Sequence, residues 1–248
     1  MAAQGKIDPM HQFTIEPIAS LHIGSYNVSF TNSALWMTIT LVLIFGFMAL
    51  GMKRQLVPGR WQVAVEGWTG FVDDMVKVNI GPEGKKFVPY IFTLFTFILV
   101  SNFLGLLPLA IIPGLHPFTT TSQFSLTGVL AVMSFSIVLI VGFWRHGLGF
   151  FKLFVPHGTP LPMIPLIFPI EVISLCVRPI TLGVRLMINM AVDHLILGLF
   201  MGLVAVAVPI PLMLLGILVV VVQTMVFTLL TCVYIGLATE DAHEEAHH

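Results

Sequence analysis

Long runs of apolar residues, separated by short polar or proline-rich breaks, dominate this chain from residue 33 onward. A helix needs about 20 consecutive, mostly apolar residues to cross a bilayer, so these runs predict membrane-crossing helices. The first three are expected at 33–52, 88–107 and 125–144. Apolar and polar residues do not alternate at strand length, so a transmembrane barrel is not expected.

The last two apolar segments are longer. Residues 170–208 contain a single proline, Pro179, and would reach about 60 Å as one helix, whereas the hydrocarbon layer is about 30 Å thick. This helix therefore either ends early or is strongly tilted. The turn "VPIPL" separates it from a last helix at 212–237, which predicts a helical hairpin. Four prolines between 147 and 169 predict a re-entrant or surface segment before it.

A different pattern occupies residues 58–80. Apolar side chains recur there at helical spacing among acidic and basic ones, which predicts an amphipathic helix lying on the membrane surface. The alternative is a packing helix like those of soluble proteins. Residues 1–32 form an N-terminal segment without the apolar core of a signal peptide, and 238–248 form a polar tail, solvated or left from a tag.

The composition agrees with this interpretation. The chain is 57% hydrophobic and 9% charged, whereas a soluble domain has about 25% charged residues. The net charge of -1 gives no reason to expect a nucleic-acid partner. Cys176 and Cys232 lie inside apolar runs and are expected as core residues rather than as a disulfide or metal site. The prediction is one all-α integral membrane domain, 1–248, with about five membrane-crossing helices.

Basic residues predict the orientation, because they favour the cytoplasmic side of a membrane. Six of them lie between the first two expected spans, and Arg145 and Lys152 follow the third. The N-terminus and the "VPIPL" turn are therefore expected outside, and the C-terminus inside. This orientation suits a multi-pass protein of the bacterial inner membrane, although the mitochondrial inner membrane is also compatible.

Charged residues are unexpected in the apolar stretch that begins after Pro169. On a helix with 100° per residue, five polar side chains point within about 40° of the direction of Glu171. They span about 33 Å along the helix axis. They are Glu171, Arg178, Arg185, Asn189 and Asp193. His194 points about 100° away from Asp193. On the last helix, Gln223 and Tyr234 share one face.

Two explanations suit these residues. Glu171 and Arg178 are two turns apart and could form an ion pair that merely holds helices together. Arg185 has no acidic residue three or four positions away, and an unpaired arginine at membrane depth costs at least about 2.5–3.5 kcal/mol. Such a residue usually faces water or a partner chain and marks an ion pathway. The titratable groups on either side of Arg185 then suggest two half-paths separated by a permanent cation.

Several stretches carry a resemblance to one family. "RPITLGVRLMINM" followed by "DHLIL", together with "QTMVFTLLTCVYI" and "SNFLGLLP", resembles subunit a of the F-type ATP synthase membrane sector. The resemblance covers essentially the whole chain. It implies a proton-translocating stator subunit with two aqueous half-channels to a rotating ring of c subunits, which couples the proton motive force to ATP synthesis. Further partners would be the peripheral-stalk b subunits, the remaining ATP synthase complex and membrane lipid.

The resemblance also implies roles for individual residues. Arg185 matches the family's essential arginine, and Asn189 and Gln223 match the polar residues that flank it. Glu171 matches an acid of the inner half-channel, and His194 a position in the outer one. Supporting polar residues are expected at Arg178, Thr181, Tyr234 and Asn102.

Two positions depart from the family pattern. Asp193 stands where the family usually has glycine, and Gly216 stands where many members have an acid or a histidine. Asp193 is therefore expected to supply the missing carboxylate. The sequence is compatible with either protons or sodium, because the ion ligand would lie mainly on the ring.

Other classes of membrane protein are less compatible with the sequence. A haem or quinone subunit of an electron-transfer complex would need paired histidines inside spans, and only His194 lies in one. A self-contained ion transporter would show an internal repeat, whereas the charged stretch occurs once. No phosphate loop or nucleophile beside a base is present, so the chain is expected to have no active site of its own. No cofactor and no metal are expected.

Overall fold

The computed structural model describes residues 17–19, 22–23, 26–27, 29–52, 59–106, 123–147, 163–203 and 209–239. Five of its helices are long and apolar enough to cross a membrane. They are α1 (Asn32–Gly51), α3 (Val88–Leu106), α4 (Phe124–His146), α5 (Ile164–Leu203) and α6 (Pro209–Thr239). The all-α membrane class expected from the sequence is confirmed.

Short β-ladders precede α1. Strand β1 (Pro17–Ala19) pairs antiparallel with β4 (Phe30–Thr31), and β2 (His22–Ile23) pairs antiparallel with β3 (Tyr26–Asn27). At the end of this segment Thr31 caps α1, because its side-chain oxygen accepts a hydrogen bond from the backbone nitrogen of Ala34 at 3.4 Å.

Helix α2 (Arg60–Ile80) is amphipathic, as the sequence predicts. Its buried residues, among them Val72 and Val76, pack into a core cluster with side chains of α3, α4 and α6. Asp73 and Lys77 are joined by an ion pair of 2.5 Å, and this hydrogen bond raises the pKa of the Lys77 ammonium. The helix ends at Gly81, whose positive φ of 83° turns the chain into the 3₁₀-helix η2 (Pro82–Lys86).

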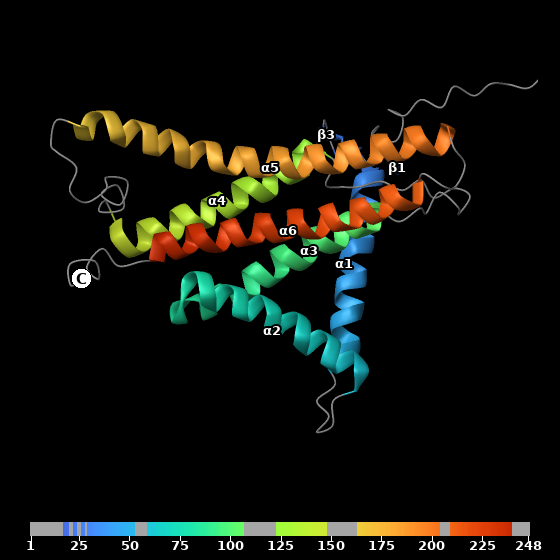
Figure 1. The fold of residues 1–248 in the computed structure, drawn as a ribbon, viewed down its shortest axis with the longest axis horizontal. Coiled ribbons are helices and arrows are strands. Elements are labelled where there is room, and N and C mark those ends of the chain that lie inside the picture. The colour runs from blue at the N-terminus through green and yellow to red at the C-terminus, as the bar shows by residue number, and fades with distance from the viewer. Residues whose placement is uncertain are drawn as a thin grey trace, which may run out of the picture.

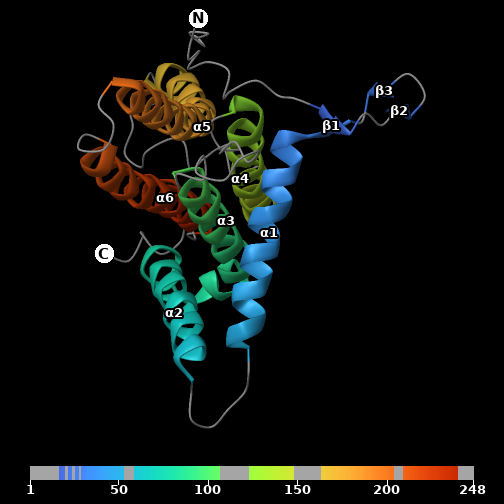
Figure 2. The same ribbon diagram turned by 90° about the vertical axis from the view of Figure 1, so that its right-hand side faces the viewer.

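Helices α5 and α6 run side by side along the longest axis of the molecule, and α1 crosses them steeply (Figure 1). The second view shows α3 and α4 between this pair and α1 (Figure 2). A second core cluster fills the space between α3, α4, α5 and α6, with Ile98, Leu186 and Phe227 fully buried. One side of the α5–α6 pair is therefore packed against protein, while apolar side chains such as Ile180 and Ile188 remain exposed on α5.

The C-terminal end of α6 packs directly on α2. A Cβ atom at Gly236 would lie 2.5 Å from the backbone oxygen of Asn79, so no larger residue fits between the two helices there. The same end of the molecule also holds an ion pair between Arg145 of α4 and Glu83 of η2. The C-terminal ends of α4 and α6 and the 3₁₀-helix η2 therefore lie together.

Helix α5 differs from expectation at its start. It begins at Ile164, so residues 164–169 are helical and not part of a re-entrant or surface segment. Pro165 is tolerated because the first four backbone N–H groups of a helix have no intrahelical acceptor. Helix α5 also continues through Pro179, which removes one hydrogen bond from its interior. Residues 148–162, 204–208 and the tail from 240 lie outside the described part of the chain.

Candidate functional site

The five polar residues expected along one line all lie on α5, a single helix of 40 residues. Arg185 is near the middle of the helix, and its side chain is exposed. No hydrogen bond or ion pair joins the Arg185 guanidinium to any side chain that the structure describes. The neighbouring residues Leu182 and Leu186 are buried in the core, so Arg185 lies at the border of the packed and the exposed faces of α5.

One turn beyond Arg185, the amides of two helices meet. The Nδ2 atom of Asn189 donates a hydrogen bond of 2.8 Å to the Oε1 atom of Gln223 in α6. Gln223 is only 5% exposed, and its Nε2 atom is buried without a partner among the described residues. This bond joins α5 and α6 one turn from Arg185.

Toward the start of α5, Glu171 and Arg178 form the ion pair that the simpler explanation required. The Nη2 atom of Arg178 lies 3.4 Å from the Oε1 atom of Glu171. The guanidinium carbon also lies 5.1 Å from the centre of the Tyr234 ring. Thr181 donates its hydroxyl to the backbone oxygen of Arg178 at 2.8 Å and so remains a local helix contact. Arg178 thus contacts Glu171 directly, and Tyr234 contacts Arg178. Both were expected as supporting residues.

Toward the other end of α5, Asp193 is half-buried, and its Oδ2 atom is buried without a partner among the residues described. His194 lies in α5, but its side chain is outside the described set. A Cβ atom at Gly216 of α6 would lie 2.9 Å from the Cδ1 atom of Leu106 in α3, so a larger residue there requires the leucine side chain to move. Asn102, also on α3, is fully buried.

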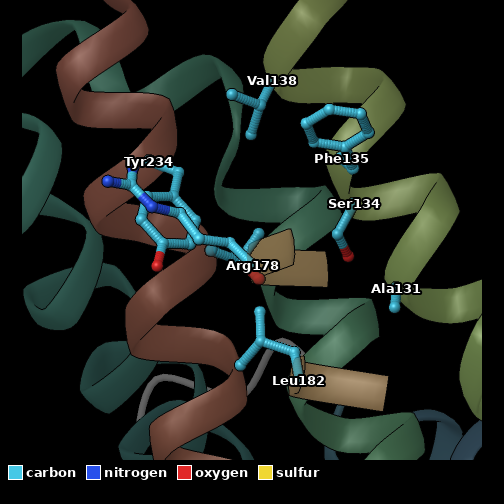
Figure 3. A pocket seen from close by; sticks show the side chains of 8 residues that line it. Ala131, Ser134, Phe135, Val138, Arg178, Leu182 and Tyr234 are labelled. Carbon is cyan, nitrogen blue, oxygen red and sulfur yellow. The ribbon is translucent and has the colours of Figure 1, made fainter. Parts of the chain in front are cut away.

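Sequence reasoning missed one polar contact in this region. The hydroxyls of Tyr90 in α3 and Ser134 in α4 are 2.9 Å apart. Ser134 also lines a cavity of about 20 Å³ between α4, α5 and α6, together with Arg178 and Tyr234 (Figure 3). In the sequence, Ser134 is recognisable as a polar residue inside an apolar span. Serine also bonds to the backbone of its own helix, so the sequence did not indicate Tyr90 as its partner.

Within the described residues, no group of three or more His, Cys, Asp or Glu side chains could hold a metal ion. The candidate functional groups among the described residues are charged side chains and side chains that donate or accept hydrogen bonds. Fold and side chains together define the class: a polytopic helical membrane protein with ionisable groups on a helix long and apolar enough to cross a membrane.

Comparison with known proteins identifies the family. The family described as "ATP synthase A chain" matches residues 34–236. The chain is 56% identical to ATP synthase subunit a of Novosphingobium aromaticivorans, over 94% of this chain and 97% of that protein. It is 54% identical to ATP synthase subunit a of Sphingopyxis alaskensis, over 95% and 98%, and 42% identical to that of Rhodospirillum rubrum, over 92% and 96%. The chain belongs to the ATP synthase subunit a family, as the "RPITLGVRLMINM" stretch predicted, and it is therefore a multi-pass component of the ATP synthase complex.

Proposed function

We propose that this chain is the proton-translocating stator subunit of its ATP synthase, with Arg185 separating two aqueous half-channels that open toward a rotating ring of c subunits. The observation that carries the proposal is the exposed Arg185 side chain, unpaired among the described residues, in the middle of an apolar helix. An unpaired arginine at this depth is retained where it meets water or a partner chain. A carboxylate on each passing c subunit would be that partner.

Arg185 would act on this carboxylate through its charge. A carboxyl group in a low-dielectric site prefers to stay protonated, and a cation within about 4–6 Å favours the ionised form. The proton therefore leaves as the c subunit approaches Arg185. The same fixed charge repels a proton that moves directly from one half-channel to the other. Arginine suits this role because it stays charged at any relevant pH, whereas a desolvated lysine can lose its proton.

Three polar residues on α5 would serve the two half-channels. Glu171 lies 14 residues before Arg185, or about 21 Å along the helix, and would guide protons on the inner side. Asp193 and His194 lie about 12 Å beyond Arg185 and would line the outer side. Asn189 and Gln223, joined by their hydrogen bond, would hold α5 and α6 together where the two paths approach each other. Arg178, Thr181, Tyr234 and Asn102 would be supporting residues.

Asp193 would replace the group that Gly216 lacks. Leu106 lies against Gly216, so an acid at this position of α6 would require the leucine side chain to move. The buried, unpartnered Oδ2 atom of Asp193 provides a carboxylate from α5 instead.

The proposed orientation places the N-terminus outside and the C-terminus inside the bacterial inner membrane, with residues 53–86 and 145–160 inside. The positive-inside rule supports it, because Lys85 and Lys86 lie in η2. The pair between Glu83 and Arg145 and the contact of Gly236 with Asn79 supply further support, since they bring these inside segments together. The c-ring and the peripheral-stalk b subunits are the proposed partners.

The decisive experiment replaces Arg185 in the purified complex, reconstituted into liposomes. Arg185→Ala is expected to abolish ATP synthesis driven by a proton gradient and proton pumping driven by ATP, while the complex still assembles. Arg185→Lys should fail as well. Arg60→Ala is the matched control, because Arg60 is also exposed but lies at the start of α2. Coupled synthesis at the normal rate in Arg185→Ala would overturn the proposal.

A further inference from the structure

The guanidinium of Arg178 is held from two helices at once. On its own helix, it contacts Glu171 through a single N–O distance of 3.4 Å. From α6, the Tyr234 ring lies under it at 5.1 Å, within the distance of about 6 Å at which the face of an aromatic ring attracts a cation. Figure 3 shows the arginine head lying across this ring.

The remaining walls of the cavity attract this cation weakly. Ala131, Phe135 and Val138 of α4 and Leu182 of α5 contribute apolar side chains. The hydroxyls of Ser134 and Thr231 donate their hydrogen bonds to backbone oxygens of their own helices, at 2.9 Å each. Among the described residues, the Glu171 carboxylate and the Tyr234 ring are thus the side chains that hold Arg178.

The ion pair alone would hold Arg178 poorly. The side chains of Arg178 and Glu171 are 31% and 40% exposed. Exposed ion pairs contribute little, because water screens the charges and two long side chains lose rotamer freedom. A planar guanidinium also stacks on an aromatic face, and a ring fixed on a neighbouring helix removes many of its alternative rotamers. The ring therefore decides where the cation lies beside Glu171.

We propose that Tyr234 is a positioning residue for the inner half-channel: its ring holds Arg178 beside Glu171 on the face of α5 that leads to Arg185. This inference rests on the proposed function, since it assigns Glu171 to the proton path. The ring face carries the role, and the phenolic hydroxyl does not. Without the ring, Arg178 moves among several rotamers, Glu171 loses its steady counter-charge, and proton transfer on the inner side becomes slower.

The test uses the assembled complex in inverted membrane vesicles, with ATP-driven proton uptake measured by quenching of a fluorescent amine. Tyr234→Phe keeps the ring and is expected to pump at the normal rate. Tyr234→Leu is expected to pump about two- to fivefold more slowly, the range that corresponds to a partly exposed cation–π contact. Arg178→Lys should also be slower, because a compact ammonium does not stack in the same way.

Two comparisons separate positioning from a general packing role. In an Arg178→Gln background, Tyr234→Leu should cause no further decrease, because the cation it positions is absent. Thr231→Val is the matched control on the same face of α6 and should pump normally. Each variant is compared at equal amounts of co-purified complex. If Tyr234→Leu lowers assembly, Tyr234→Met takes its place, because methionine fills irregular gaps in a core without an aromatic face.

Normal pumping by Tyr234→Leu, or equal slowing by Tyr234→Phe and Tyr234→Leu, would overturn the inference. A further decrease in the Arg178→Gln background would overturn it too. Arg185→Ala in the same vesicles separates this failure from failure of the proposed function. If Arg185→Ala abolishes pumping while Tyr234→Leu pumps normally, only the positioning role is wrong. If Arg185→Ala pumps normally, the proposed function is wrong and the inference with it.

Discussion

Asn189 and Gln223 join the two longest helices through one hydrogen bond of 2.8 Å between their side-chain amides, one turn away from Arg185. Gln223 is almost fully buried, so its oxygen depends on the Asn189 donor. The bond thus links the packing of α5 and α6 to the position of the proposed barrier between the half-channels.

The first prediction concerns this bond. Asn189→Leu leaves the Gln223 oxygen buried without a donor, which should destabilise the subunit by about 1–3 kcal/mol. The Asn189→Leu, Gln223→Leu double variant should lose less stability than the two single variants lose together, because it leaves no buried amide unpaired. The measurement is the temperature at which this subunit dissociates from the purified complex. Strictly additive losses would show that the two amides do not interact.

The outer half-channel gives a second prediction. Asp193→Asn removes the only charge on α5 beyond Arg185 that the structure describes, and His194→Ala removes its titratable neighbour. Both variants should slow passive proton flow through the membrane sector and shift its dependence on the outside pH. The measurement is the rate of pH change in vesicles stripped of the nucleotide-binding subunits. An unchanged rate and pH profile in both variants would contradict this assignment.

A third prediction concerns the exchange of Asp193 for an acid at position 216. In Asp193→Gly, Gly216→Glu, the new side chain meets Leu106, whose Cδ1 atom would be 2.9 Å from its Cβ atom. Proton flow should therefore be slow in this double variant and should recover in part when Leu106→Ala is added to make space. Leu106→Ala alone is the control for lost core packing, which costs about 2–5 kcal/mol. A double variant as fast as the unchanged protein would show that Leu106 does not exclude an acid.

Glu171 is the subject of the fourth prediction. Glu171→Gln keeps the size of the side chain and one acceptor for Arg178 but removes the titratable group. ATP-driven proton pumping should decrease while the amount of assembled complex stays normal. Loss of assembly instead would indicate that the ion pair with Arg178 mainly holds the helices together.

The sequence predicted the helical membrane class because long apolar runs leave few alternatives in a bilayer. It also predicted that Glu171, Arg185 and Asn189 share one helix, since a period of 3.6 residues is a local property. The start of α5 was predicted too late, because Pro165 and Pro169 suggested a break. The first turn of the helix tolerates Pro165, and the helix continues through Pro169.

Contacts between helices were harder to predict. The ring of Tyr234 meets Arg178 between α6 and α5, and Tyr90 meets Ser134 between α3 and α4, so each contact joins residues that are far apart in the chain. Helical periodicity shows which residues share a face, but it does not show which faces of different helices meet or at what height. The same reason hid the close approach of Leu106 to Gly216.

The close approach of Gly236 to Asn79 has a mechanical consequence. Under the proposed function, a rotor that turns against α5 and α6 would exert a sideways force on this pair of helices. At the C-terminal end of α6 that force would pass from backbone to backbone into α2, because no side chain lies between Gly236 and the Asn79 oxygen to yield. Helix α2, which is too polar to be a membrane span, would thereby support α6 and keep the proposed stator rigid under torque.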